Sequence, residues 1–208
     1  MRFRTSGVQS AAGWLGRLAR LDLTVFEDIR SSPPATTSAI GVVFAASVMA
    51  GIGSWLWAVE WSPIEATDVF IRSLVIGSIL QTLAWFIWVY LVFLVLARAY
   101  GTRTDFAELI RTMGYAFSPM ALSVLIWVEG FTVPFGVISI SSTVLLSFFA
   151  MQAASSAEPR QALVANLAGF TVFAVVMGVL ANIGEVSAGG GAGIGGSAPG
   201  LFFFDLDF

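Results

Sequence analysis

Five long apolar stretches without a charged residue constrain the fold of this 208-residue chain more than any other feature. They cover residues 31–59, 73–97, 112–128, 130–157 and 161–184. A helix that crosses a bilayer needs about 17–25 mainly apolar residues, so each stretch is long enough. Charged residues make up 11% of the chain, whereas soluble domains contain about 25%. The sequence therefore predicts an all-α, polytopic membrane helical bundle.

Turn-forming and charged residues between these stretches predict three parts. Residues 1–34 form an N-terminal segment with an amphipathic helix, residues 35–184 a five-span membrane domain, and residues 185–208 a flexible Gly-rich tail. The spans are expected at about 35–57, 73–97, 106–128, 132–154 and 161–183. The Phe-rich end of the tail has two open interpretations, insertion into the outer leaflet or docking on a partner.

The third span carries two local signals. Asp105 with Glu108 three residues later resembles a capping box, which predicts that a helix begins there. Pro119 lies within the apolar part, where a proline frees the carbonyl four residues earlier and kinks the helix. Neighbouring helices or hydroxyls such as those of Ser118 and Ser123 can satisfy the freed carbonyl of Tyr115.

Residues 8–30 have the periodicity of one amphipathic helix. The apolar side chains recur every three or four residues, at Trp14, Leu18, Leu21, Val25 and Ile29. Arg17 and Arg20 lie on the opposite side. Two interpretations remain open: the helix lies in the headgroup plane with Trp14 at the interface, or it packs on its own bundle.

The residue types that are missing exclude most catalytic chemistry. The chain has no Cys and no His, and all ten cations are Arg. Catalysis by a Ser-His-Asp or Cys-His arrangement and ligation of zinc by His or Cys are therefore unavailable. We predict a non-enzymatic protein with no catalytic, cofactor-binding or metal-binding residue. The charge-free stretches also lack the ionisable groups of an ion-coupled pump.

The arginines predict an orientation. With five spans and the N-terminus inside, nine arginines face the cytoplasm and Arg72 alone faces outward. Because cytoplasmic loops carry an excess of Arg and Lys, we expect a protein of the cytoplasmic membrane with its N-terminus inside and its C-terminus outside. Arg103, Asp105, Glu108 and Arg111 form the densest charge cluster, which is more typical of helix capping and headgroup contact than of acid–base catalysis.

Several residues are candidates for contact with the interface or a partner: Trp14, Arg17, Arg20, Arg103 and Arg111. Small residues at four-residue spacing, such as Gly41 with Ala45 and Ala165 with Gly169, favour close helix pairing. That pairing is intramolecular by default, with self-association as the alternative.

A motif in the third span, Gly114-Tyr115 followed by Pro119, resembles the Yip (Ypt/Rab-interacting protein) family of membrane proteins. Tyr100-Gly101 precedes it, and the chain looks like a bacterial member. The resemblance covers roughly residues 22–183 and implies five spans and no catalytic residues. For eukaryotic relatives the resemblance implies vesicle-trafficking scaffolds that bind prenylated small GTPases; that partner is not carried over to a bacterial-looking chain.

The leading hypothesis is a scaffold, membrane-organising or accessory subunit of a membrane assembly. Its expected partners are the lipid bilayer and another membrane protein or a second copy, with no nucleic acid. The alternative is a small transport component for a neutral or lipidic substrate.

Overall fold

The computed structural model describes residues 6–61, 66–182 and 198–203. Five helical segments in this part are long and apolar enough to cross a membrane: α3 (Ala35–Trp61), Thr67–Ala99, Phe106–Trp127, α7 (Thr132–Ala154) and α8 (Pro159–Asn182). The described residues form no strand, only an isolated antiparallel bridge between Thr104 and Ser155. The all-α polytopic fold is therefore confirmed.

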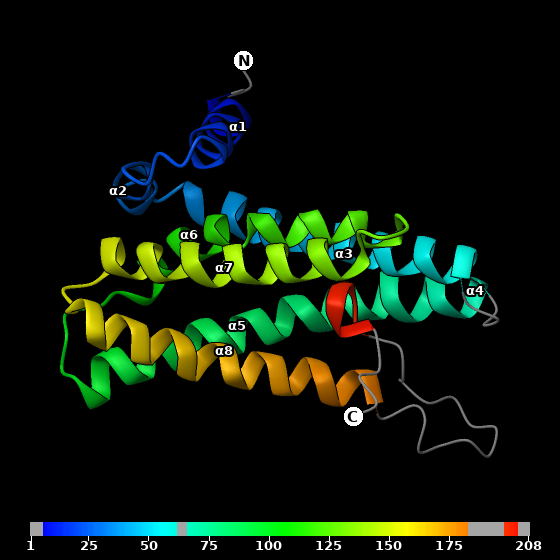
Figure 1. Ribbon diagram of the computed structural model, residues 1–208. Helices are drawn as coiled ribbons and strands as arrows, with labels where there is room; N and C mark the ends of the chain where they lie inside the picture. Colours follow the sequence, from blue (N-terminus) through cyan, green and yellow to red (C-terminus); the bar gives the residue numbers. More distant parts are fainter. Residues whose placement is uncertain (1–5, 62–65, 183–197, 204–208) are drawn as a thin grey trace.

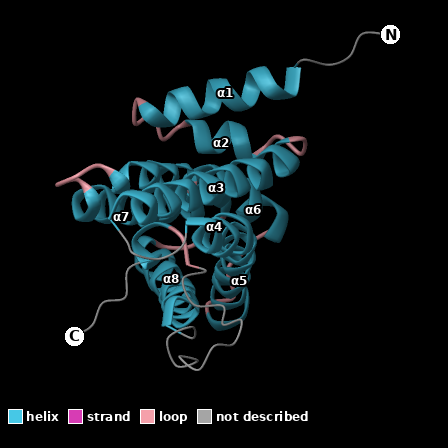
Figure 2. Cartoon of the chain, turned by 90° about the vertical axis from the view of Figure 1, so that its right-hand side faces the viewer, coloured by secondary structure: helices cyan, strands magenta, loops and turns pink. Residues whose placement is uncertain are grey.

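The spans lie in two layers, seen from the side in Figure 1 and from one end in Figure 2. One layer contains α3, α7 and, between them, the segment that begins with α6 (Phe106–Ala116); the other contains α5 (Ser78–Leu94) and α8. The short helices α1 (Ser6–Ala19) and α2 (Val25–Arg30) lie outside the first layer, with α1 running across the spans. Large apolar side chains such as Leu83 and Val175 are more than half exposed, as is typical of a surface that faces lipid.

The second span is longer than the charge-free stretch. It comprises α4 (Ala66–Val69), a π-helical segment η1 (Phe70–Gly77), α5 and a second π-helical segment η2 (Val95–Ala99). Arg72 pairs with Asp68 one turn earlier at 3.5 Å, which supports the first turn. The helical segment therefore extends beyond Arg72 and Arg98, the two charged residues that bound the apolar stretch.

Pro119 changes the type of helix, which differs from the expected kinked α-helix. α6 ends at Ala116 and is followed by a ten-residue 3₁₀-helix, η3 (Ser118–Trp127). Proline has no N–H to continue the α-helical pattern, and the amide of Met120 donates to Phe117 three residues back. Of the groups considered for the Tyr115 carbonyl, the Ser123 hydroxyl pairs with Ser139 at 2.8 Å.

The single helix expected over residues 8–30 is also wrong, because residues 20–24 form a corner between α1 and α2. Leu21 has φ +60°, a left-handed conformation that ends a helix. The Asp22 carboxylate accepts from both the amide and the hydroxyl of Thr24, a local turn that competes with helix. Leu18, Val25 and Ile29 of the expected apolar stripe are buried, whereas Leu21 is 76% exposed.

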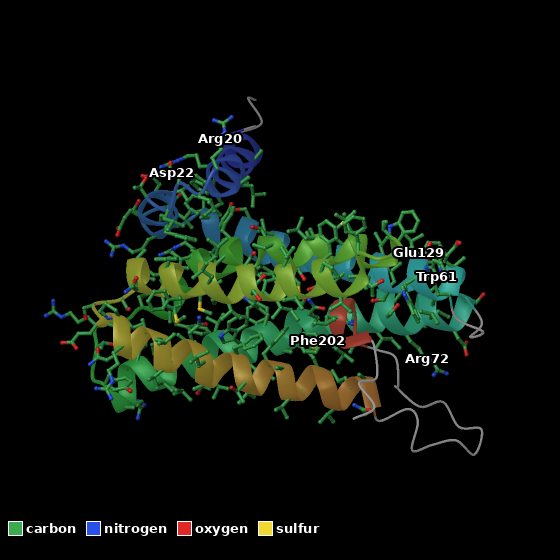
Figure 3. The ribbon with its side chains drawn as sticks, viewed as in Figure 1. Arg20, Asp22, Trp61, Arg72, Glu129 and Phe202 are labelled. Carbon is green, nitrogen blue, oxygen red and sulfur yellow. The ribbon has the colours of Figure 1, made fainter. Side chains whose placement is uncertain are left out.

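Residues 198–203 of the tail pack against the bundle. The amide of Gly200 donates to the hydroxyl of Ser54 in α3 at 2.9 Å, and the short helix η4 (Gly200–Phe203) follows. Figure 3 shows Phe202 between the two layers, where its ring stands 5.9 Å from that of Phe173. The described end of the tail therefore docks on its own bundle, while residues 183–197 and 204–208 lie outside the described part.

Candidate functional site

Gly114 lets α6 approach α3 closely. A Cβ at this position would lie 2.7 Å from the Cβ of Ala39 and 3.0 Å from its carbonyl oxygen. Such a distance is far below van der Waals contact, so only glycine fits without moving a helix. The motif glycine therefore sets the spacing between two neighbouring spans.

Tyr115 connects α6 to two other helices. Its side chain is fully buried, and its hydroxyl donates to the Ser38 hydroxyl at 2.8 Å. The ring of Trp14 in α1 packs edge-on against it, with centroids 5.4 Å apart. The candidate residues Trp14 and Tyr115, a hundred positions apart in the chain, thus form one contact between α1 and the bundle.

Arg17 is the centre of an ion-pair network at the corner between α1 and α2. It contacts the carboxylates of Asp22 at 2.7 Å and Asp28 at 2.5 Å, and the Thr24 hydroxyl at 3.0 Å. Hydrogen bonds from Thr24 and then Arg17 lower the pKa of Asp22, and the bonds to Asp22 and Asp28 raise the pKa of Arg17. This network fastens α2 to α1 and engages the Arg17 side chain within the chain.

The other cationic candidates have different environments. Arg20 is exposed and points away from the spans (Figure 3). Arg111 is only 9% exposed, so its side chain lies largely inside the bundle. Arg103 is exposed and, among the described residues, has no ion pair.

A polar pocket of about 770 Å³ lies at the end of the bundle that contains Arg103. Three parts of the chain line it: the end of α2, residues 102–108, and the residues that follow α7. The side chains are charged or carry hydroxyls, apart from Ala154; they are Arg30, Thr102, Arg103, Thr104, Asp105, Glu108, Ser155 and Ser156. The pocket therefore offers both positive and negative groups at the surface.

Hydrogen bonds fix the walls of this pocket. The amide of Arg103 donates to the Ser156 hydroxyl at 3.0 Å, and the amide of Ser156 donates to the Arg103 carbonyl at 3.2 Å. Arg30 donates to the carbonyl of Ala153 at 2.9 Å. Asp105 caps α6 by accepting from the amide of Glu108, so the helix start expected there is confirmed. Hydrogen bonds between side chains and the main chain, with one between main-chain groups, therefore hold the pocket in shape.

An apolar pocket of about 420 Å³ lies between α1 and Pro119. Leu15 and Leu18 of α1 form one wall, and Leu145 of α7 forms part of the other. The proline motif is thus adjacent to the helix that runs across the spans.

The sequence did not identify Ser38, Arg30, Ser155 or Ser156 as site residues. Ser38 lies in an apolar run, where a hydroxyl usually bonds to its own helix. Ser155 and Ser156 belong to a turn that precedes Pro159. The proximity of Ser155 and Ser156 to Arg103 depends on packing between α6 and α7, and that packing has no local signal in the sequence.

The geometry defines an integral membrane protein built from five apolar helices, with a Gly-Tyr-Pro motif where three helices meet. The family model described as Yip1 domain matches residues 23–183. The chain belongs to the Yip1-domain family, which confirms the resemblance carried by Gly114, Tyr115 and Pro119. Comparison with curated proteins gave no match, and neither did comparison with solved structures.

Proposed function

We propose that this protein is a non-enzymatic scaffold or accessory subunit that organises a membrane assembly through the unit formed by α1 and α2. One observation carries the proposal: the Trp14–Tyr115 contact joins this peripheral unit to the motif helix α6. A unit docked in this way presents a defined surface instead of a loose N-terminal segment. The partner is a membrane protein or a second copy of the chain.

The exposed residues of the corner support this role. Leu21 is 76% exposed beside the exposed Arg20, although most apolar side chains of this unit are turned to the bundle. An apolar side chain next to a cation is typical of a segment at the boundary of lipid and water. We propose that the N-terminus is cytoplasmic, as the arginine distribution predicts, and that α1 lies at the inner boundary of the membrane.

A gentle detergent purification of the full chain tests the scaffold role. We expect one stoichiometric partner or a dimer, which Trp14→Ala weakens because the α1–α2 unit is then loosely attached. Trp61→Ala is the matched control, since Trp61 lies at the C-terminal end of α3, away from α1, and donates to the Trp127 carbonyl. A monomer without a partner in the wild type, or equal recovery with both variants, contradicts the proposal.

A second candidate is a transport component for a neutral or lipidic substrate. It is favoured by buried polar atoms without a hydrogen-bond partner between the spans, in Gln81, Ser147 and Asn166. Such atoms destabilise an apolar core unless water or a ligand pairs with them. Substrate flux into proteoliposomes that contain only this protein supports transport; no flux for sugars, polyols and short-chain lipids opposes it.

A further inference from the structure

The polar pocket at the Arg103 end carries balanced charges in one concavity. Arg30 and Arg103 are cationic, and Asp105 and Glu108 are anionic. Arg30 is already partnered, because Glu27 lies 3.6 Å and Glu108 lies 3.8 Å from its guanidinium. Arg103 has no such partner among the described residues. The pocket therefore has the unpaired guanidinium of Arg103 on its lining together with two carboxylates. Glu108 is shared with Arg30 at 3.8 Å, and Asp105 accepts from the Glu108 amide, so each keeps acceptor capacity for a further donor.

This arrangement of charges determines whether an anion, a cation or a zwitterion binds best in the pocket. A simple anion bound at Arg103 meets the like charges of Asp105 and Glu108, and a simple cation meets Arg103 and Arg30. A zwitterion satisfies both sets, because its negative group pairs with Arg103 and its positive group with the carboxylates. The two charges of the ligand must be close enough to fit within the same pocket.

The residues that line the pocket indicate which negative group and which positive group the zwitterion carries. Arginine with a neighbouring hydroxyl donor matches the acceptor oxygens of a phosphate. Here that donor is Ser156, whose hydroxyl accepts from the Arg103 amide and keeps its own proton. A quaternary ammonium is recognised by aromatic rings, and no aromatic residue is among the described residues that line the pocket. Carboxylates instead accept hydrogen bonds from a primary ammonium.

We propose that this pocket binds a phosphoethanolamine group, with the phosphate on Arg103 and the ammonium on Glu108 and Asp105. The group is supplied by a phosphatidylethanolamine headgroup or by the free phosphate ester. The pocket lies at the start of α6 and the end of α7, which is where a lipid headgroup lies beside a membrane span. The site is independent of the scaffold role, which depends on Trp14 and Tyr115.

Calorimetric titration of the purified full chain in a non-ionic detergent at low salt tests the site. The probes are dihexanoyl phosphatidylethanolamine, the matching phosphatidylcholine and phosphatidylglycerol, and O-phosphoethanolamine. We expect the phosphatidylethanolamine to bind most tightly. Arg103→Gln should weaken it about tenfold or more, since a charge-assisted hydrogen bond is lost. The fold is retained because only the main chain of Arg103 bonds to Ser156.

Two further variants separate the site from general electrostatics. Glu108→Gln should reduce the preference for phosphatidylethanolamine over phosphatidylglycerol while some binding remains. Arg160→Gln removes an exposed cation outside the pocket and should change nothing. Equal binding of the three lipids, equal loss in Arg160→Gln and Arg103→Gln, or no binding of any probe overturns the proposal. Tight binding of O-phosphoethanolamine identifies the free ester as the source, and weak binding identifies the lipid.

Discussion

The ring of Trp14 stands edge-on to the ring of Tyr115, with an interplanar angle of 89° and centroids 5.4 Å apart. Tyr115 is fully buried, although it belongs to the layer of α3, α6 and α7 on which α1 lies. The helix α1 therefore shields part of its side chain from the surroundings. The contact makes the attachment of the N-terminal unit depend on a residue of the third span.

Removing this ring should loosen α1. Trp14→Ala loses an edge-on aromatic pair, worth about 0.5–1.5 kcal/mol beyond the buried area, and should expose the peptide bonds after Arg17 and Arg20. Limited trypsin digestion in detergent, followed by mass spectrometry, measures the change as faster cleavage at these two sites. Trp61→Ala should leave these rates unchanged. Equal cleavage in wild type and Trp14→Ala would show that Trp14 does not hold α1.

Gly114→Ala should destabilise the bundle. The new methyl group would lie 2.7 Å from the Cβ of Ala39, and overpacking of this kind typically lowers the free energy of unfolding by about 1–3 kcal/mol. Gly178→Ala is the matched control, because a Cβ there meets nothing within 4 Å. A thermal unfolding assay in detergent should show a lower midpoint for Gly114→Ala alone. Equal midpoints for both variants would contradict the close approach of α6 to α3.

The corner between α1 and α2 should open in acid. The pKa of Asp22 is lowered from its usual 3.8, so its ion pair contributes fully above this value and is lost as the pH falls through the lowered pKa. A nitroxide on Gly16→Cys, a position with open space around a Cβ, reports the mobility of α1. We expect greater mobility in acid, and in Asp22→Asn at every pH. Asp68→Asn should behave like wild type; no difference between Asp22→Asn and wild type would contradict the prediction.

The orientation can be tested with fusions to a reporter that is active only outside the cytoplasm. A fusion after Arg103 should be inactive and one after Gly130 active, because these turns follow the second and third spans. The reverse pattern would place the N-terminus outside.

Docking of the tail should shield Ser54. Gly200 has φ +67°, and a Cβ there would lie 3.1 Å from the Ser123 hydroxyl oxygen, so Gly200→Val should release the segment. The chain has no native cysteine, and Ser54→Cys is therefore a unique label. A maleimide should react with it slowly in the parent and faster in Gly200→Val. Gly130→Val, at another left-handed glycine but with open space around a Cβ, should leave the rate of this labelling reaction unchanged. Fast reaction in the parent would contradict the docked tail.

The sequence was informative wherever a local pattern decides the structure. The uncharged stretches predicted five apolar spans, and Asp105 predicted the start of α6. The conformation of Leu21 could not be predicted in this way, because the ion pairs of Arg17 with Asp22 and Asp28 outweigh an uninterrupted apolar periodicity. The same holds for η3, since a proline alone predicts a kink and does not determine which helix type follows.

The site was less accessible to sequence analysis. Gly114, Tyr115 and Pro119 were identified by resemblance, but their contacts with Ala39 and Trp14 are long-range. Arg17 and Arg111 were candidates for the interface or a partner because of the amphipathic periodicity and of the charge cluster at the start of α6. The structure pairs Arg17 with carboxylates within the corner and buries Arg111, and both environments depend on tertiary packing.

The glycines near the C-terminal end of α3 limit which substitutions this protein can accept during evolution. A Cβ on Gly51 would lie 2.9 Å from the Cα of Leu74, and one on Gly53 would meet the Ser123 carbonyl. Both obstacles are main-chain atoms, so no change of side-chain rotamer removes them. A larger residue becomes acceptable only if a neighbouring helix shifts as well, which takes several substitutions. α3, η1 and η3 should therefore diverge together among homologues, whereas Gly41, which faces open space in the same helix, is free to change alone.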